Sequence, residues 1–167
     1  MNREETIFLD TSALIPLLTE SHCNHYKVRR YLKETKCSCC IDSIVLSEFL
    51  TGAKSPKEKR VVLDIIARQF RVLSLSVIGA QIGAQIFKCL KEKGVVPKGK
   101  TDRQITRVDV LILASAIENR VNTILYEDNH FFSMIQHVKD IIIPNYSIPN
   151  PIRIVDIPGD LFDNISN

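Results

Sequence analysis

The sequence of 167 residues has no long hydrophobic run, and its first residues do not have the pattern of a secretory signal peptide. Its longest apolar stretch, residues 108–117, is interrupted by Asp109 and Ser115, whereas a membrane-spanning helix needs about 20 apolar residues. Membrane spanning is therefore excluded. The first ten residues carry acids and only a short apolar run, which is not the basic-then-apolar form of a signal peptide. We expect an intracellular, cytoplasmic protein.

Composition is that of an ordinary globular protein, with 45% hydrophobic and 25% charged residues. A chain of this length buries about 70% of its unfolded surface, so it needs no disulfides or metals to fold. The sequence contains no repeats, no low-complexity tract and no segment typical of a linker. We expect one domain over residues 1–167.

The net charge of +3, from 22 basic and 19 acidic residues, is too small to indicate a polyanion-binding protein by itself. The basic residues gather, however, between residues 88 and 107, where seven of them stand against two acids. This segment is a candidate phosphate-contacting surface, in which we single out Lys98, Lys100 and Arg103. An exposed helix end and loop kept soluble by charge is the alternative interpretation.

Five cysteines, an odd number in a chain expected inside the cell, predict reduced thiols. Cys37, Cys39 and Cys40 lie close together, but their spacing is not that of the paired ligands of structural zinc sites. We interpret residues 37–41 as a short strand whose thiols fill buried positions.

Short β-prone runs alternate with longer helical patterns along the chain. Such alternation predicts an α/β protein, a three-layer α/β/α fold with a central parallel five-stranded sheet. Thr106 is predicted to cap the sixth helix, residues 94–100 to form a loop and residues 141–151 an irregular connection. The expected strands are residues 6–9, 37–41, 71–75, 123–126 and 152–157, and the expected helices are residues 13–18, 22–35, 43–51, 57–69, 77–93, 108–119 and 129–138.

Four acids stand where a site is expected. Asp10 and Asp128 directly follow predicted strands, and ligands of parallel sheets bind beyond the carboxyl ends of the strands. Glu48 and Asp109 interrupt segments that otherwise have a buried pattern, so their carboxylates need a partner or a cation. Each acid also has a structural interpretation, because three of them could serve the starts of helices and Glu48 could face solvent or pair with a lysine.

The segments around these acids resemble the four motifs of the PIN-domain ribonucleases, in the order of that family. They read IFLDTSAL at residues 7–14, SIVLSEFLTG at 43–52, VDVLILASA at 108–116 and LYEDNHF at 125–131. The resemblance spans nearly the whole chain and is strongest to the VapC-type toxins of type II toxin–antitoxin systems. One departure is Tyr126, which stands where the family usually has Thr or Ser.

The resemblance implies a metal-dependent endoribonuclease. Asp10, Glu48 and Asp109 are then the core ligands of Mg²⁺ or Mn²⁺, with Asp128 assisting, since clustered carboxylates repel one another until protons or a hard cation neutralise them. A bound ion activates water for attack on phosphorus, so no nucleophilic side chain is required. Ser12 either orients Asp10 or a water molecule, or caps a helix.

The other residues of these segments leave alternatives open. His130 and His137 are interpreted as incidental to the chemistry. The implied partners are RNA, a cognate antitoxin and a second copy of the chain, whose contact we expect at Val61, Val62, Ile65 and Ile66. Two rival functions within the family are an RNA-processing nuclease without an antitoxin and a non-catalytic RNA-binding module. An aspartyl-phosphate phosphatase is disfavoured, because it needs a second acid at the position of Ser12.

Overall fold

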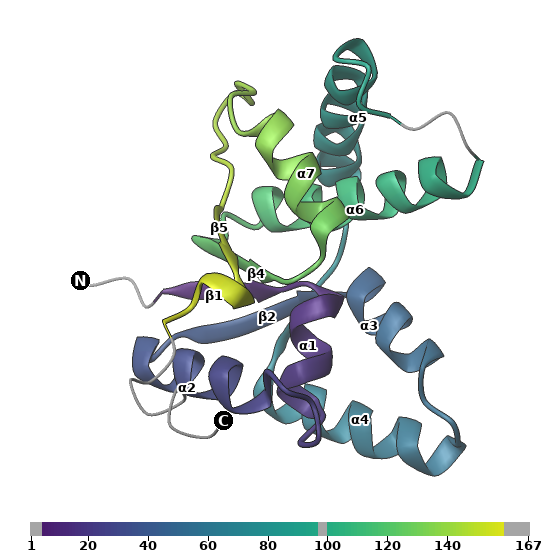
Figure 1. Ribbon diagram of the computed structural model, residues 1–167. Coiled ribbons are helices and arrows are strands. Elements are labelled where there is room, and N and C mark those ends of the chain that lie inside the picture. The colour runs from purple at the N-terminus through teal and green to yellow at the C-terminus, as the bar shows by residue number, and fades with distance from the viewer. Residues whose placement is uncertain (1–4, 97–99, 159–167) are drawn as a thin grey trace.

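A computed structural model describes residues 5–96 and 100–158, and it confirms the predicted three-layer α/β/α fold. Five strands form one sheet, in which every neighbouring pair is parallel. Helices cover both faces of this sheet (Figure 1). The strands are β1 (Thr6–Leu9), β2 (Ser38–Asp42), β3 (Arg71–Leu73), β4 (Thr123–Tyr126) and β5 (Asn150–Arg153).

The strand order, β3-β2-β1-β4-β5, places β1 in the centre. The chain first builds outward from β1 to β3 and then crosses to β4 and β5 on the other side, so the order reverses between β1 and β4. Loops diverge at such a point and leave a crevice at the carboxyl edge of the sheet. Leu9 pairs with Leu125, and the backbone amide of Asp10 donates to the carbonyl of Leu125 at 3.0 Å. This pairing brings Asp10 to the loop that follows β4.

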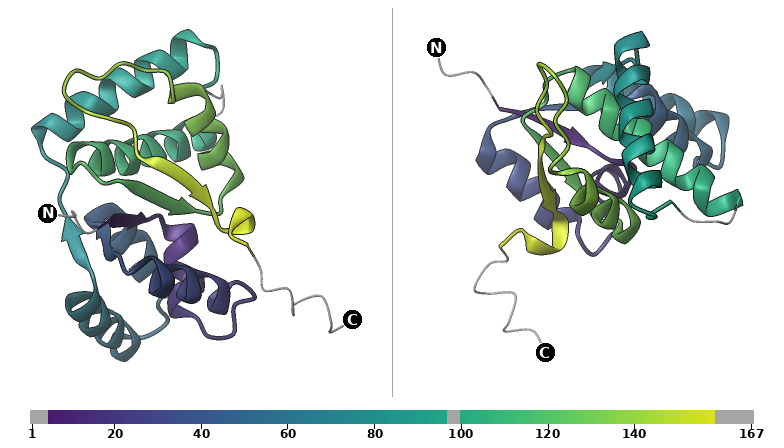
Figure 2. Two further views of the ribbon diagram at one scale, coloured as in Figure 1. Left: turned by 90° about the vertical axis from the view of Figure 1, so that its left-hand side faces the viewer. Right: turned by 90° about the horizontal axis from the view of Figure 1, so that it is seen from above.

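Two groups of helices enclose the sheet. Figures 1 and 2 show α5, α6 and α7 on one face and α1, α2 and α4 on the other. None of the helices in the described part of the chain is both long and apolar enough to cross a bilayer. The helices are α1 (Thr11–Leu18), α2 (His25–Thr35), α3 (Ser43–Thr51), α4 (Pro56–Gln69), α5 (Val77–Glu92), α6 (Lys100–Glu118) and α7 (Asn129–Val138).

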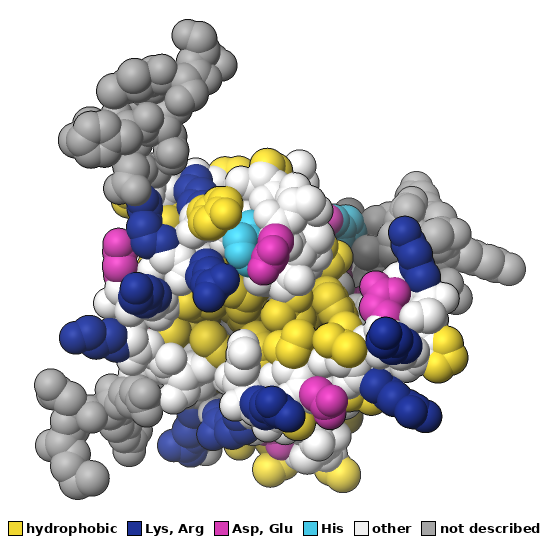
Figure 3. Space-filling view, turned by 90° about the horizontal axis from the view of Figure 1, so that it is seen from below, with side chains coloured by type: hydrophobic (Ala, Val, Ile, Leu, Met, Phe, Trp, Pro, Cys, Tyr) yellow, Lys and Arg dark blue, Asp and Glu magenta, His cyan; other side chains and the backbone are white. Residues whose placement is uncertain are grey.

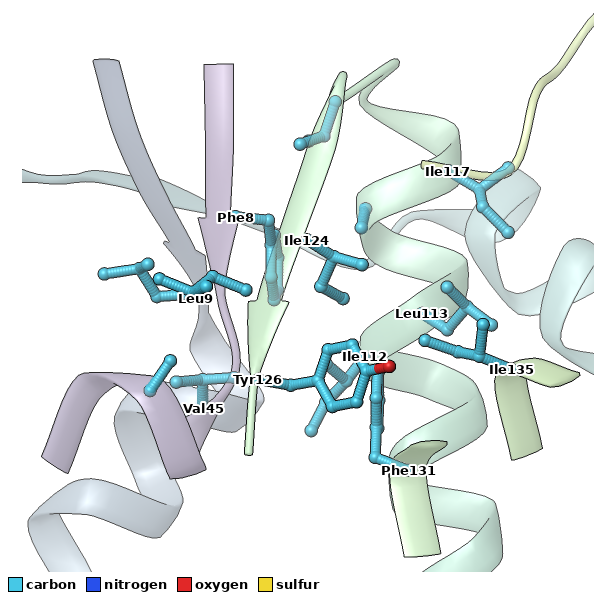
Figure 4. Close-up of a cluster of buried hydrophobic side chains, with 14 of the residues drawn as sticks. Phe8, Leu9, Val45, Ile112, Leu113, Ile117, Ile124, Tyr126, Phe131 and Ile135 are labelled. Carbon is cyan, nitrogen blue, oxygen red and sulfur yellow. The ribbon is translucent and has the colours of Figure 1, made fainter. Parts of the chain in front are cut away.

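The hydrophobic core explains why the two central strands are almost entirely apolar. Ile7–Leu9 are fully buried, as is Ile124 on β4, because helices cover both faces of the sheet there. Figure 4 shows Ile124 of β4 and Ile112 of α6 between the strand and the helix, whereas Leu113 and Ile117 lie on the side of α6 toward Ile135 of α7. Truncation of a buried aromatic such as Phe8 to alanine typically costs about 3 to 5 kcal/mol. The core therefore holds the strand ends, and the acids that follow them, in place.

Two predicted elements differ most from the structure in their boundaries. The sixth helix begins at Lys100 rather than after Thr106, which lies in its interior, because the Lys, Arg and Gln residues before Thr106 are good helix formers. The last strand, predicted over residues 152–157, spans Asn150–Arg153 and ends in a 3₁₀ turn, Ile154–Asp156. The strand is displaced because its four residues pair with the four residues of β4.

The cysteine segment is only partly as predicted. Residues Ser38–Asp42 form β2, but only Cys40 of the three neighbouring thiols is buried, while Cys37 and Cys39 are half-buried. The thiol of Cys40 donates to the carbonyl of Ile7 at 3.6 Å. Burial raises the pKa of Cys40 to about 11, so this thiol stays protonated at neutral pH.

Candidate active site

Asp10 lies at the carboxyl end of the central strand and is almost fully buried. It caps α1, and its Oδ2 accepts hydrogen bonds from the Ser12 amide at 3.1 Å and the Ser12 hydroxyl at 2.6 Å. Burial raises the pKa of Asp10, an effect that the Ser12 hydrogen bonds partly offset and the negative charge of Glu48 increases. A carboxylate in this position favours a proton or a cation beside it.

Ser12 joins the first acid to the fourth. The Ser12 hydroxyl accepts hydrogen bonds from the backbone amides of Glu127 at 2.8 Å and Asp128 at 3.3 Å, both in the loop after β4. Asp128 caps α7, since its Oδ1 accepts the Phe131 amide at 2.8 Å, and it is exposed. Asp10, and not Ser12, is the N-cap residue of α1. The geometry therefore supports the interpretation that Ser12 orients Asp10 over the interpretation that it caps a helix.

Glu48 differs from the sequence-based expectation, because its side chain is exposed rather than buried. It lies on α3, and its Oε2 accepts a hydrogen bond from the hydroxyl of Thr11 at the start of α1. The apolar neighbours of Glu48 in the sequence predict burial, yet a helix in a surface layer turns part of every such segment outward. Glu48 still lies near enough to Asp10 for its charge to raise the pKa of that acid.

Asp109 lies on α6 with 16% of its side chain exposed. Its Oδ2 is 2.7 Å from Nδ1 of His130, on the first turn of α7. Burial raises the pKa of Asp109 to about 6, the contact with His130 lowers it, and the charges of Asp10 and Asp128 raise it further. These mutual effects indicate that Asp10, Asp109 and Asp128 lie in one electrostatic neighbourhood.

The imidazole of His130, which the sequence analysis interprets as incidental to the chemistry, joins two polar groups of α6 in the structure. Besides Asp109 at Nδ1, its Nε2 lies 3.3 Å from the Thr106 hydroxyl. This hydroxyl–imidazole–carboxylate order resembles that of a nucleophilic triad. Thr106 is 2% exposed, however, so a polymeric substrate cannot reach it. His137 lies toward the end of α7, where its carbonyl accepts a hydrogen bond from Lys93.

Asp42 is an acid that the sequence analysis missed. It ends β2, is fully buried, and caps α3 by accepting the Val45 amide at 2.8 Å. Burial raises the pKa of Asp42 to about 6, although the Val45 amide and the Ser115 hydroxyl lower it and Glu48 raises it. The signal that could have found it is the one used for Asp10, an acid directly after a predicted strand.

The two residues that precede Asp128 in the sequence make contacts outside the candidate site. The carboxylate of Glu127 accepts a hydrogen bond from Asn24 at 2.6 Å, which ties this loop to the segment before α2. Tyr126, the departure from the family pattern, points into the core beside Phe131, with 5.3 Å between the ring centroids (Figure 4). The hydroxyl near the fourth acid is therefore that of Ser12.

The donor set of this site fits a hard divalent cation in its chemistry. Asp10, Glu48, Asp109 and Asp128 offer carboxylate oxygens, the ligands that Mg²⁺ and Mn²⁺ prefer, and burial disfavours their charged forms without a counter-ion. Within the described part of the chain, no three His, Cys, Asp or Glu side chains are already arranged around one ion position. The side chains must therefore adjust if they are to share an ion.

Basic residues of interest are carried by α6 and by the end of β5. Lys98 lies outside the described residues, and Lys100 and Arg103 belong to the first turns of α6, the helix that carries Asp109. Arg153, at the end of β5, was missed by the sequence analysis. Its guanidinium donates to Asn129, next to Asp128, at 2.7 Å and lies 4.7 Å from the centre of the Phe132 ring.

A groove beside Glu48 collects exposed apolar side chains. Figure 3 shows hydrophobic side chains in a hollow of the face formed by α1, α2 and α4. The part of it between α1, α3 and α4 is a cavity of about 450 Å³ with Glu48 and Glu58 in its lining. Of the four apolar residues predicted to lie at a protein interface, Ile66 belongs to the core instead. The other groove residues are Ile15, Leu18, Thr19, Phe49, Gly52, Ala53, Val61, Val62 and Ile65.

Known proteins share this architecture. The VapBC2 complex of Rickettsia felis, bound to a promoter DNA fragment, contains a chain 20% identical to this one, with a TM-score of 0.60 over 89% of this chain and 98% of that chain. A chain of VapBC-1 from nontypeable Haemophilus influenzae is 14% identical, with a TM-score of 0.64 over 90% and 98% of the two chains. VapC20 of Mycobacterium tuberculosis, a toxin that cleaves the sarcin–ricin loop, is 18% identical, with a TM-score of 0.55 over 76% and 93%.

At these identities the structural similarity demonstrates a common fold and nothing more. No curated protein sequence matches the chain. The sequence profile of the PIN domain, however, matches residues 7–135, which include all four acids. The chain therefore belongs to the PIN domain family.

Proposed function

We propose that this protein is a metal-dependent endoribonuclease and the toxin component of a toxin–antitoxin pair. The observation that carries the proposal is the electrostatic coupling of four acids at the switch point of the sheet, where burial and mutual repulsion raise the pKa values of Asp10 and Asp109. Structural acids that only cap helices are not expected to converge in this way. A shared cation explains why such acids are kept together.

Asp10, Glu48, Asp109 and Asp128 are the residues that we propose to hold Mg²⁺ or Mn²⁺. When bound, the ion supplies Lewis acidity, which lowers the pKa of a water molecule and stabilises charge on the phosphate. The chain itself orients these ligands. Ser12 fixes Oδ2 of Asp10 and the loop of Asp128 at once, and Thr11 holds Glu48. Thr106 is buried, and we assign no covalent nucleophile.

The proposed substrate is RNA in single-stranded or loop form, and the proposed location is the cytoplasm. The start of α6 leads from the basic segment directly to Asp109, so a phosphate backbone bound there is guided toward the acids. Arg153, which donates to Asn129 next to Asp128, adds a cation near the fourth acid. The support for RNA over DNA comes from the PIN domain family and from the similar fold of VapC20, a toxin that cleaves the sarcin–ricin loop.

The proposed partners are an antitoxin and a second copy of the chain. The similar chains from Rickettsia felis and Haemophilus influenzae come from VapBC complexes, and the apolar groove beside Glu48 offers a docking surface for an apolar segment of such a partner. Glu48 and Glu58 in its lining favour a segment that also carries a basic residue. A cation in that position would compete with the metal ion for Glu48, and this is the route by which we propose that such a partner inhibits the site.

Two rival functions remain testable against this one. An RNA-processing nuclease shares the acids but has no antitoxin, so a small open reading frame beside the gene, encoding a DNA-binding start and an apolar tail, favours the toxin. A non-catalytic RNA-binding module keeps the fold and does not cleave. The presence of all four acids favours catalysis, because a module that only binds has no need for them.

The deciding experiment is a cleavage assay on mixed cellular RNA after treatment with EDTA, followed by Mn²⁺ or Mg²⁺. We expect cleavage to return with the metal for the parent and for two controls that change exposed acids away from the site, Glu92→Gln and Asp140→Asn. We expect none for Glu48→Gln and Asp10→Asn. Cleavage that continues in EDTA, or that survives both site variants, contradicts the proposal.

A further inference from the structure

The imidazole of His130 bridges two residues of α6 that stand on the same face of the helix. Thr106 and Asp109 are three positions apart, which places their side chains side by side. His130 reaches both from α7, with Nδ1 2.7 Å from Oδ2 of Asp109 and Nε2 3.3 Å from the hydroxyl of Thr106. Hydrolysis by metal-bound water needs neither His130 nor Thr106, so this link requires its own explanation.

The position of the imidazole is fixed by α7 itself. His130 is the second residue of that helix, directly after the turn that Asp128 caps through the Phe131 amide. The Asp128 loop is held in turn by the Ser12 hydroxyl. The imidazole is therefore anchored to the same loop as the fourth acid, and it connects that loop to Asp109 on a different helix.

One arrangement of the hydrogens satisfies both contacts with a neutral imidazole. An ionised carboxylate only accepts hydrogen bonds, so Nδ1 of His130 donates to Asp109. The neutral imidazole then has its acceptor at Nε2, which receives the hydroxyl hydrogen of Thr106. Each donor meets an acceptor in this chain without any charge on the imidazole. In this arrangement the hydroxyl of Thr106 favours the tautomer that donates to Asp109.

We infer that His130 is a positioning residue, which occupies Oδ2 of Asp109 and presents the other carboxylate oxygen to the divalent cation. This inference rests on the proposed function, because it assigns Asp109 as a ligand. Hydrogen-bonded partners of ligating carboxylates orient them, and their loss typically weakens metal affinity or activity by 10- to 100-fold. Asp109 needs such a partner, because a carboxylate with 16% exposure has few water molecules to hold it in one orientation.

The test compares His130→Asn with His130→Gln, since the side-chain amide nitrogen of Asn takes the place of Nδ1 and that of Gln the place of Nε2. The measurement is Mn²⁺ binding, followed by electron paramagnetic resonance, beside the metal concentration that gives half-maximal cleavage. We expect His130→Ala and His130→Gln to weaken Mn²⁺ binding by 10- to 100-fold, and His130→Asn to recover most of it. Because Asn and Gln carry the same amide group, a difference between them reports its position rather than general damage to the fold.

Three controls complete the design. His137→Ala, on the same helix, is expected to bind Mn²⁺ as the parent does. Thr106→Val is expected to weaken binding by a few-fold through loss of the tautomer-selecting hydroxyl, and Thr106→Ser to restore it. Circular dichroism melts check that each variant is folded.

Parent-like Mn²⁺ binding in His130→Ala, or equal behaviour of the Asn and Gln variants, overturns the inference while the proposed function stands. A parent protein that neither binds Mn²⁺ nor cleaves RNA overturns both.

Discussion

The hydroxyl of Ser12 donates to Oδ2 of Asp10 at 2.6 Å. The same hydroxyl accepts the amides of the loop that carries Glu127 and Asp128. One side chain thus joins the end of the central strand to the loop of its neighbour across the switch point. Two acids more than a hundred residues apart in sequence depend on this hydroxyl for their relative position.

Ser12→Ala is therefore expected to lower cleavage by 10- to 100-fold, the usual effect of losing a residue that orients a ligand. The Glu127 amide also loses its acceptor, which costs about 1 kcal/mol of unfolding free energy. Cleavage rates and thermal melts measure the two effects. Ser133→Ala, an exposed serine on α7, is the matched control and is expected to change neither. A Ser12→Ala protein of parental activity contradicts the role given to this hydroxyl.

Neutralisation of Asp10 is expected to separate activity from stability. Burial raises the pKa of Asp10, so Asp10→Asn removes an unfavourable charge and should melt at or above the parent at pH 7.5 without metal. At a metal concentration of a hundred times Kd, binding to the folded parent adds about 2.7 kcal/mol to the unfolding free energy. This gain should vanish in the variant. Calorimetry with and without Mn²⁺ measures both. A variant that unfolds in the absence of metal favours a purely structural role for this acid.

Asp42 predicts a specific dependence of stability on pH. Burial raises its pKa from 3.8 to about 6 in the folded protein, so between these values the folded state binds a proton that the unfolded chain has released. The contribution of Asp42 to the unfolding free energy is fully present below pH 3.8. It falls by about 3 kcal/mol as the pH rises through 6. Asp42→Asn keeps the helix cap and should unfold at a higher denaturant concentration than the parent at pH 7.5.

The same comparison at pH 4 is the control for Asp42, because the parent carboxyl is then largely protonated in the folded state. The two proteins are expected to be nearly equal in stability at that pH. An Asn variant that is less stable than the parent at pH 7.5 shows that the ionised form of Asp42 is the native one.

The protein is predicted to form a homodimer. Variants on α4 test whether the second copy covers the apolar groove. Light scattering at micromolar concentration should give the dimer mass for the parent, and a monomer mass contradicts this prediction. Val61 lines the groove and is 51% exposed, whereas Leu63 on the same helix is 43% exposed and does not line it. If a second copy covers the groove, Val61→Asp becomes monomeric while Leu63→Asp stays dimeric. A dimer that persists in Val61→Asp shows that the second copy does not cover the groove, which leaves the groove available to the antitoxin.

The basic segment before Asp109 predicts how RNA affinity depends on salt. Each phosphate neutralised on a single strand contributes about 0.7 to the slope of log affinity against log salt. Replacement of Lys100 and Arg103 by alanine should reduce the slope by up to about 1.4 and weaken the binding of many RNA sequences to the same extent. Replacement of Lys98 together with either of these residues should have the same effect. Asp10→Asn is used as the background to prevent cleavage, and Lys57→Ala with Lys59→Ala on α4 is the control. An unchanged slope favours the solvated-surface interpretation.

Much of the fold follows from local patterns in the sequence. The apolar runs of β1 and β4 predict buried parallel strands, and Asp10 and Asp128 stand at their ends because an acid that follows a strand can cap the next helix. Both signals are contained within a few residues of chain. The PIN-like motifs follow from the same short segments, so the family was predictable before the structure. Boundaries such as that of β5 were not, because a strand ends where its partner ends.

The sequence by itself thus determined the parallel α/β fold and the family and made the four acids candidates for the site, since strand burial and helix capping are local properties. Only the tertiary structure decided which side chains meet. The neighbouring positions of β1 and β4 bring Ser12 to the Asp128 loop, and the packing of α7 on α6 brings His130 to Asp109. The tertiary structure also buries Asp42 at the end of β2 and leaves Glu48 exposed. Contacts between distant elements depend on strand order and helix packing, which no single segment encodes.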